Sequence, residues 1–207
     1  MSQVRALCVM VCVALTVVAR AAVAGEELST DEIRALSSGQ LVVREDQTEH
    51  NGRRYVGGVS YVVIGARPRE VSHLLDDARV YRDILPRTRS VRWLGIARTG
   101  ESILELEQGT SLVHGRYVAR VRRDRGGDDD SAIFRFWLDP SFRHDIADAS
   151  GFFRVEPFGD KTLLTYLVLI DLGDGLFVRL FEHRVQRAAL STPALVKTYV
   201  ESHRPPS

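Results

Sequence analysis

The residues of this chain that are equipped for acid–base chemistry are few, and His144-Asp145 is the closest approach to a catalytic pair. A histidine beside a carboxylate can act as a general acid or base near neutral pH. The loop that holds the pair, 139–148, offers no second base and no nucleophile at a suitable spacing. The spacing therefore favours a hydrogen-bonding role for His144 within its loop, with general acid–base catalysis as the alternative.

Other catalytic and metal-binding patterns are not found in the sequence. The six histidines form neither an H-x-x-x-H nor an H-E-x-x-H motif, and a metal site would need three or four convergent ligands. Ser111 and Ser141 lack the context of a nucleophile elbow, and no glycine-rich phosphate loop joins a strand to a helix. We therefore expect no catalytic residue, no metal and no cofactor.

The first 24 residues have the pattern of a secretory signal peptide. Arg5 supplies the positive charge, and 6–19 is an apolar run that is too short to span a bilayer. Ala22-Val23-Ala24 matches an A-x-A cleavage site. We expect cleavage after Ala24 and a protein outside the cytoplasm, periplasmic or secreted; an uncleaved anchor is the alternative.

Composition restricts the chemistry of the remaining chain. Both cysteines, Cys8 and Cys12, lie in the leader, so a chain that begins at Gly25 has neither disulfides nor thiol chemistry. The 28 Lys and Arg residues of the whole chain nearly balance 27 Asp and Glu residues, which gives no electrostatic reason to bind nucleic acid. The length predicts one domain with a sizeable core.

The order of the expected elements is that of an α+β protein. A short helix begins at a capping box formed by Ser29 and Glu32, 41–43 is a short strand, and the polar stretch 44–54 reads as a loop or turn. Strands are expected at about 55–64, 89–97, 101–108, 111–123, 131–138, 152–158 and 162–170, with two short helices, 68–75 and 78–84, after the first of them. This pattern predicts helices on one face of an antiparallel sheet.

The strand 111–123 indicates which side chains face inward. Its alternation gives one inward set, Val113, Gly115, Tyr117, Ala119 and Val121. The outer set carries Arg116, Arg120 and Arg122, and the stripe continues into Arg123 and Arg125. Two interpretations stay open: a transient contact with an anionic membrane surface, or a solvated face balanced by the acidic residues 128–130.

The last third of the chain predicts a hairpin followed by one long helix. Gly159-Asp160-Lys161 supplies the turn, and 163–170 is apolar on both faces, as in a strand covered on both sides. Apolar residues then recur at helical spacing, namely Phe177, Phe181, Val185 and Ala188, and Pro193 should bend this helix. A curved sheet closed by such a helix tends to enclose a cavity. The bend is either a gate or a fixed fit to the sheet.

Four segments together resemble the helix-grip (SRPBCC) superfamily, which joins START lipid-transfer domains, pollen-allergen-like binders, polyketide cyclases and coenzyme Q-binding proteins. They are the strand-to-helix junction 63–71, the segment 76–86 with its aspartate, aromatic residue and Leu85-Pro86, the glycine–aromatic strand 151–157, and 162–166 with the final helix. The resemblance covers about 55–201. It implies the helix-grip fold over 55–204: a curved antiparallel sheet wrapped around a long C-terminal helix, with two short helices after the first strand. The signal peptide (1–24) and an extension (25–54) precede this domain.

Two functions fit this fold, which hosts many chemistries. A carrier of a lipid, quinone or polyketide-like compound needs only an apolar cavity with a few polar anchors. A cyclase or dehydratase needs several inward ionisable groups, whereas Tyr117 and Tyr166 are the polar side chains expected inside. We favour the carrier over the enzyme; a protein-interaction module is a third reading.

The expected cavity is lined by side chains from four regions. They are Trp93, Tyr117, Phe134, Phe136, Leu138, Phe153, Tyr166, Phe177, Phe181 and Val185. The alternative for each of them is a place in a solid core between helix and sheet.

Overall fold

A computed structural model describes residues 27–110, 114–127, 130–174 and 176–203, without the side chains of 176–180. The expected signal peptide with Cys8 and Cys12 lies outside the described residues. So do Ser111, Val113, the acidic pair 128–129 and the side chain of Phe177.

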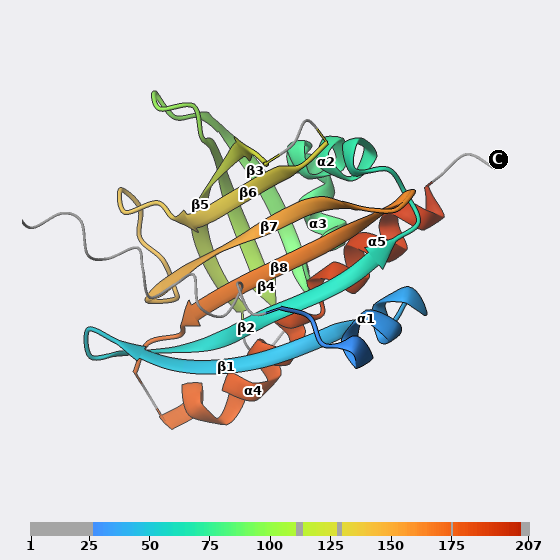
Figure 1. Ribbon diagram of the computed structural model, residues 1–207. Helices are drawn as coiled ribbons and strands as arrows, with labels where there is room; N and C mark the ends of the chain where they lie inside the picture. Colours follow the sequence, from blue (N-terminus) through green and yellow to red (C-terminus); the bar gives the residue numbers. More distant parts are fainter. Residues whose placement is uncertain (1–26, 111–113, 128–129, 175, 204–207) are drawn as a thin grey trace, which may run out of the picture.

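The described residues form one curved antiparallel sheet of eight strands in the order β1-β2-β8-β7-β6-β5-β4-β3 (Figure 1). The strands are β1 (Val42–His50), β2 (Arg53–Ile64), β3 (Thr88–Ile96), β4 (Ser102–Gly109), β5 (His114–Arg125), β6 (Ala132–Leu138), β7 (Asp148–Phe158) and β8 (Lys161–Asp171). Strands that follow each other along the chain are mostly neighbours in the sheet. The exception is β2, which pairs with β8 instead of β3, so that the N-terminal hairpin lies beside the last strand.

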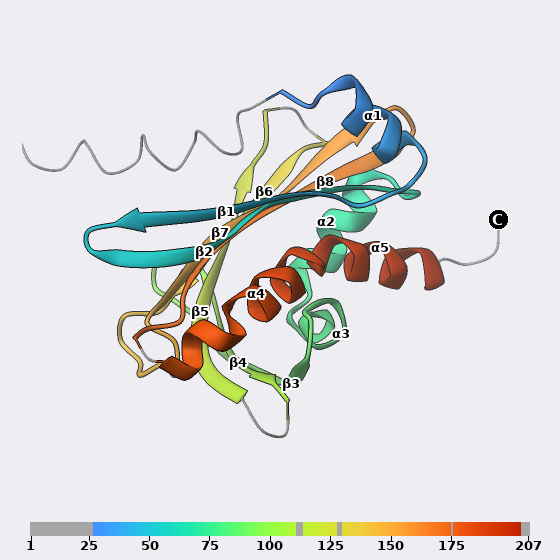
Figure 2. The ribbon, with the colours of Figure 1, turned by 90° about the horizontal axis from the view of Figure 1, so that it is seen from below.

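The helices divide between the two faces of the sheet. Helix α1 (Thr30–Ser37) packs on one face, and α2 (Pro68–Asp76), the 3-10 turn η1 (Ala78–Val80), α3 (Tyr81–Ile84), α4 (Leu176–Leu190) and α5 (Thr192–Ser202) lie on the other. Figure 2 shows that the sheet curves around α4 and α5, so theirs is the concave face. None of the helices in the described part is long and apolar enough to cross a membrane.

Strand β8 is covered on both faces, as its apolar pattern predicts. Leu164, Tyr166 and Val168 join the larger core on the concave side. Leu167 joins a smaller core on the convex side, together with Leu36 of α1. The expected curved sheet with a long C-terminal helix is confirmed.

Strand β1 corrects the expected loop at 44–54. Residues 42–50 are paired with β2 throughout, and the turn is reduced to Asn51-Gly52. Exposed side chains alternate with partly buried ones along β1, because it is an edge strand whose outer face meets solvent. Its backbone pairing, rather than its side chains, makes it a strand.

Two glycines let β2 bend over the C-terminal helix. A Cβ on Gly57 would lie 1.8 Å from the carbonyl oxygen of Val168, and Gly58 has φ +136°. The fully buried Gln186 of α4 donates from Nε2 to the carbonyl oxygens of Gly57 (2.9 Å) and Asp46 (3.1 Å). The bend therefore exposes strand carbonyls to a side chain that fastens α4 to β1 and β2.

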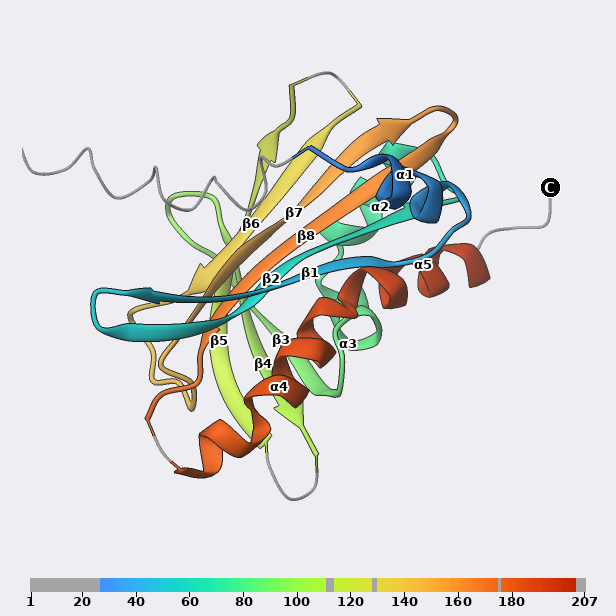
Figure 3. The same ribbon diagram turned by 60° about the horizontal axis from the view of Figure 1, so that its bottom comes forward.

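The C-terminal helix is bent, as expected, but Pro193 does not lie inside a continuous helix. The chain leaves α4 at Leu190, and Pro193 occupies the first turn of α5 (Figure 3). A proline is well tolerated there because the first helical N–H groups have no intrahelical partner. Both helices contact β2, so the bend fits the helix to the curved sheet.

Three arginines of β5 pair with acids, although with different acids from those expected. Arg120 pairs with Asp139 at 2.8 Å, and Arg122 pairs with Asp124 at 3.0 Å. Arg123 points to the other face and pairs with Asp76 of α2. Arg116 and Arg125 form no ion pair within the described part of the chain, so the stripe is compensated only in part.

Candidate functional site

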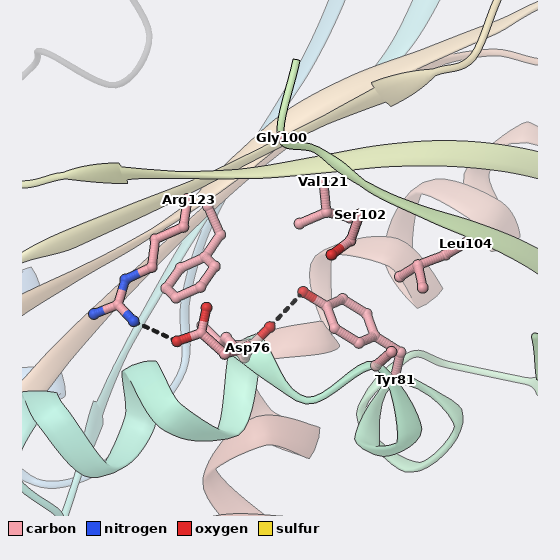
Figure 4. A pocket seen from close by; sticks show the side chains of 10 residues that line it. Asp76, Tyr81, Gly100, Ser102, Leu104, Val121 and Arg123 are labelled. Carbon is pink, nitrogen blue, oxygen red and sulfur yellow. Dashed lines mark hydrogen bonds and ion pairs between the residues drawn. The ribbon is translucent and has the colours of Figure 1, made fainter. Parts of the chain in front are cut away.

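A hollow of about 150 Å³ opens on the concave face, between the helical segment α2–η1–α3 and the strands β4 to β6 (Figure 4). The helical side contributes Leu75, Asp76, Ala78 and Tyr81. The sheet side contributes Gly100, Ser102, Leu104, Val121, Arg123 and Phe134. The walls thus combine apolar side chains with four polar ones, Asp76, Tyr81, Ser102 and Arg123.

Local sequence signals place the helical wall. Pro68 lies in the first turn of α2, and the Glu70 carboxylate accepts the N–H of Arg67 at 2.7 Å. The helix ends at Asp77, whose carboxylate accepts the N–H of Arg79 at 3.0 Å and so begins η1. The Tyr81 hydroxyl donates to the carbonyl oxygen of Leu75 at 2.9 Å. This bond ties α3 back to α2 and holds the wall in place.

An ion pair borders the outer, open side of the hollow. Asp76 and Arg123 are joined in Figure 4, and the Arg123 guanidinium lies 5.5 Å from the centre of the Phe134 ring. Both charged side chains are partly exposed, so their charges meet water as well as each other. The pair adds little net charge to the hollow.

Tyr81 is the other ionisable group of the wall. Burial, reinforced by the nearby Asp76 and Tyr166, raises the pKa of Tyr81 above its ordinary value. The hydroxyl therefore stays protonated at neutral pH and serves as a hydrogen-bonding group. The Ser102 side chain provides a second hydroxyl beside it (Figure 4).

A cluster of aromatic rings adjoins the hollow on the concave face. The Phe153 and Tyr166 rings are 4.5 Å apart, and Phe136 lies 5.9 Å from each of them. Phe134 pairs directly with Phe153 across β6 and β7 and reaches the hollow. Gly151 leaves room for Phe136, because a Cβ there would lie 2.6 Å from that ring.

Tyr117 is held by a short chain of hydrogen bonds. Its hydroxyl donates to the Gln108 Oε1, and the Gln108 Nε2 donates to the Pro86 carbonyl oxygen and to the Thr88 Oγ1, both at 3.1 Å. Burial raises the pKa values of Tyr117 and Tyr166 as it does for Tyr81. These tyrosines add polarity to the interior without charge.

The structure brings together half of the side chains predicted to line a cavity. Tyr117, Phe134, Phe136, Phe153 and Tyr166 share the large core of the concave face. Leu138 is also buried and pairs with Ala119 of β5. Of the predicted side chains that the structure describes, Phe134 alone reaches the hollow, and Phe153, 2% exposed, is packed among its neighbours.

Three predicted residues do not join this group. Trp93 lies on the edge strand β3, where its side chain is 56% exposed. Phe181 and Val185 lie on α4 and are partly buried, with the Arg184 guanidinium 5.8 Å from the Phe181 ring. Phe177 lies outside the described side chains.

Sequence reasoning missed most of the wall. Leu75, Asp76, Tyr81, Ser102 and Leu104 come from α2, α3 and β4, which lie apart in sequence and meet only in the fold. The segment 76–86, noted for its resemblance, was the available signal for Asp76 and Tyr81.

His144 occupies a structural position. Its Nδ1 accepts the N–H of Val118 at 3.2 Å, and its Nε2 lies 2.9 Å from the Asp139 carbonyl oxygen. These partners assign the proton to Nε2. The ring thus fastens its loop to β5, and among the described residues no cluster of three His, Cys, Asp or Glu could hold a metal.

Comparison with known proteins was made at the levels of sequence and structure. No protein-family model matches the chain, and no curated protein matches it. Solved structures do match. A STAR-related lipid transfer protein fragment from Xanthomonas axonopodis has a TM-score of 0.62 at 17% identity, over 78% of this chain and 98% of that one.

Two further structures represent the two functions considered. Human StAR-related lipid transfer protein 5 has a TM-score of 0.58 at 14% identity, over 88% of this chain and 94% of that one. The Zhui aromatase/cyclase from Streptomyces sp. R1128 has a TM-score of 0.52 at 17% identity, over 77% and 94%. This protein therefore has the helix-grip fold that START lipid-transfer proteins and aromatase/cyclases share.

Proposed function

We propose that this protein binds and carries an uncharged hydrophobic small molecule, part of which occupies the hollow beside Phe134. The observation that carries the proposal is a concave hollow whose walls combine apolar side chains with two protonated hydroxyl groups and a compensated ion pair. An ionised ligand would find no uncompensated partner charge there, and its desolvation would be costly. A neutral ligand with one or two hydrogen-bonding groups suits these walls.

The size of the hollow limits what it can hold. A cavity of about 150 Å³ accommodates a benzene-sized group, whereas sites for whole drug-sized ligands span about 300–1,000 Å³. We infer that the hollow takes a ring or a chain end. The rest of the molecule then extends past the Asp76–Arg123 pair, the open side of the hollow.

The two named lipid-transfer neighbours support a carrier, and the aromatase/cyclase neighbour supports the alternative of an enzyme. Asp76, Tyr81 and Ser102 are the groups that would take part in such chemistry. A tyrosine with a raised pKa is a poor base at neutral pH, and Asp76 is engaged by Arg123. The carrier stays the better-supported function.

We also propose that the protein acts outside the cytoplasm. The support is the sequence pattern of residues 1–24, with a charge, a short apolar run and an A-x-A site.

Filling the hollow with a larger side chain tests the carrier function. Val121→Phe adds a ring to the wall and should weaken binding of a fluorescent quinone or fatty-acid analogue by about tenfold or more, through lost apolar contact. Val43→Phe, on the exposed face of β1, is the matched control and should bind as the parent chain does. Mass spectrometry of the purified chain should find a lipophile that is depleted in Val121→Phe.

Equal probe binding by Val121→Phe and the parent chain would reject this hollow as the site. An enzyme would be indicated by turnover of an aromatic polyketide substrate that Asp76→Asn abolishes while probe binding persists.

A further inference from the structure

The edge strand β3 carries apolar side chains that nothing in the described chain covers. Trp93, Leu94 and Ile96 are 56%, 38% and 67% exposed, and we call them the β3 patch. They belong to β3, which forms the margin of the sheet opposite β1 (Figure 2). Clustered exposed apolar residues of this size commonly mark an interaction surface.

The unpaired charge beside the patch is positive. Residues 86–100 contain four arginines and no acidic residue. Arg89 and Arg92 are paired with Glu107 (3.5 Å) and Glu105 (2.8 Å) on β4. Arg87 and Arg98, which flank the patch, are exposed and form no ion pair within the described part of the chain. The patch is thus an apolar strip between two free positive charges.

The patch also adjoins the hollow. Trp93 pairs with Leu104, and Ile96 pairs with Ser102, across β3 and β4. Directly paired residues share a face of the sheet, and both Leu104 and Ser102 line the hollow. Trp93 and Ile96 therefore lie on the face of the sheet that carries the hollow, whereas Leu94 falls in a bulge of the pairing.

We propose that the β3 patch docks the protein on an anionic lipid membrane. Tryptophan favours the membrane–water interface, aliphatic side chains enter its apolar edge, and arginines are drawn to anionic headgroups. A second copy pairing through β3 would set these arginines against like charges, which disfavours edge-to-edge dimers. The docking proposal depends only on this surface. Transfer of a ligand from the bilayer into the hollow also rests on the proposed function.

Trp93 is a natural reporter, because Trp137 is the other tryptophan of the chain. In the Trp137→Phe background, vesicles of phosphatidylglycerol and phosphatidylcholine should shift the Trp93 emission to the blue. Lipids brominated on the acyl chain should quench it. Vesicles of phosphatidylcholine alone, or added salt, should weaken both effects.

Matched variants test which side chains contact the membrane. Ile96→Ser should lower vesicle binding by about tenfold or more, whereas Ile33→Ser, an exposed isoleucine on α1, should leave it unchanged. Arg87→Gln with Arg98→Gln should lower it by about tenfold or more, and the pair Arg69→Gln with Arg143→Gln should have little effect. Thermal melting of each variant verifies that it folds.

An unshifted Trp93 emission with anionic vesicles would overturn the proposal. So would an equal loss of vesicle binding in Ile33→Ser and Ile96→Ser, or a dimer in sedimentation that Ile96→Ser dissociates. Binding of the soluble probe, measured without vesicles, tests the hollow separately. Loss of docking and loss of ligand binding are therefore distinguishable.

Discussion

His144 illustrates how a candidate catalytic side chain can serve structure instead. Both ring nitrogens are engaged by the backbone, one as acceptor from Val118 and one toward Asp139. The adjacent Asp145 accepts the N–H of Arg116 at 2.7 Å, so neither residue of the pair is directed at the hollow. The loop 139–147 thereby completes the backbone pairing of β5 beyond the end of β6.

His144→Ala should therefore affect stability and not ligand binding. The buried N–H of Val118 would lose its acceptor, which typically costs about 1–3 kcal/mol. Urea denaturation should show this loss, while probe affinity stays within a factor of two or so. If a turnover assay is found, the rate should change less than about tenfold, and a loss of about a thousandfold would make His144 a catalytic base.

Glu32 carries a pH-dependent contribution to folding. Its carboxylate accepts two hydrogen bonds from Arg44, at 2.8 and 2.6 Å, and one from the N–H of Ser29 at 2.8 Å. The bonds from Arg44, followed by that from Ser29, lower the pKa of Glu32 from 4.5 to about 2. The pair joins α1 to β1.

The sign of the pH effect follows from this lowered pKa. Above the ordinary value of 4.5 the carboxylate is ionised in both states and the stabilisation is complete; it is lost as the pH falls through about 2. Glu32→Gln should thus lower the free energy of unfolding near neutral pH, and the difference from the parent chain should shrink toward about pH 2. A difference that is the same at both ends of this range would show that the charge is not responsible.

At the scale of elements, the alternation of side chains predicted which strand faces meet the core. Tyr117, Ala119 and Val121 of β5 pack inward, and β8 is buried on both faces. The same rule did not identify β1, because its side chains are mostly polar and its place in the sheet depends on backbone pairing with β2. The hollow was not predictable because its walls come from α2, α3, β4, β5 and β6, whose meeting depends on the curvature of the whole sheet.

Helix α4 provides the element-scale prediction. Gln186 fastens the helix to β1 and β2, so the partly buried Phe181, which lies one turn before it, can be truncated without releasing the helix. Phe181→Ala should leave the melting temperature within a few degrees, and, because Phe181 does not line the hollow, it should weaken retention of a fluorescent lipid or quinone analogue less than Val121→Phe does. A close-packed core phenylalanine would instead cost about 3–5 kcal/mol when truncated.

Phe153→Ala provides the contrast, since Phe153 is fully enclosed by Phe136 and Tyr166. Its melting temperature should fall markedly. If Phe181→Ala unfolds the protein as Phe153→Ala does, and no apolar probe binds, α4 covers a solid core and the carrier function is wrong.

At the scale of the whole molecule, the features of the concave face form one arrangement. The aromatic cluster, the hollow and the β3 patch follow one another across β8, β7, β6, β5, β4 and β3. Helices α4 and α5 cover the β2–β8 end of this face, whereas the β3 end carries exposed apolar residues. On the proposed docking, a membrane would meet the protein at the β3 end of the face that carries the hollow.

Such a carrier must reach the compartment in which its membrane surface lies, and the leader predicts that compartment. Arg5, the short apolar run and Ala22-Val23-Ala24 predict cleavage after Ala24 during export. N-terminal sequencing of the protein from a cell-envelope fraction should begin at Gly25, and replacing Ala22 and Ala24 with arginine should retain the longer chain, because the cleavage site requires small residues. A cytoplasmic protein that keeps Met1 would contradict export, and an envelope protein that keeps Met1 would identify the leader as an anchor.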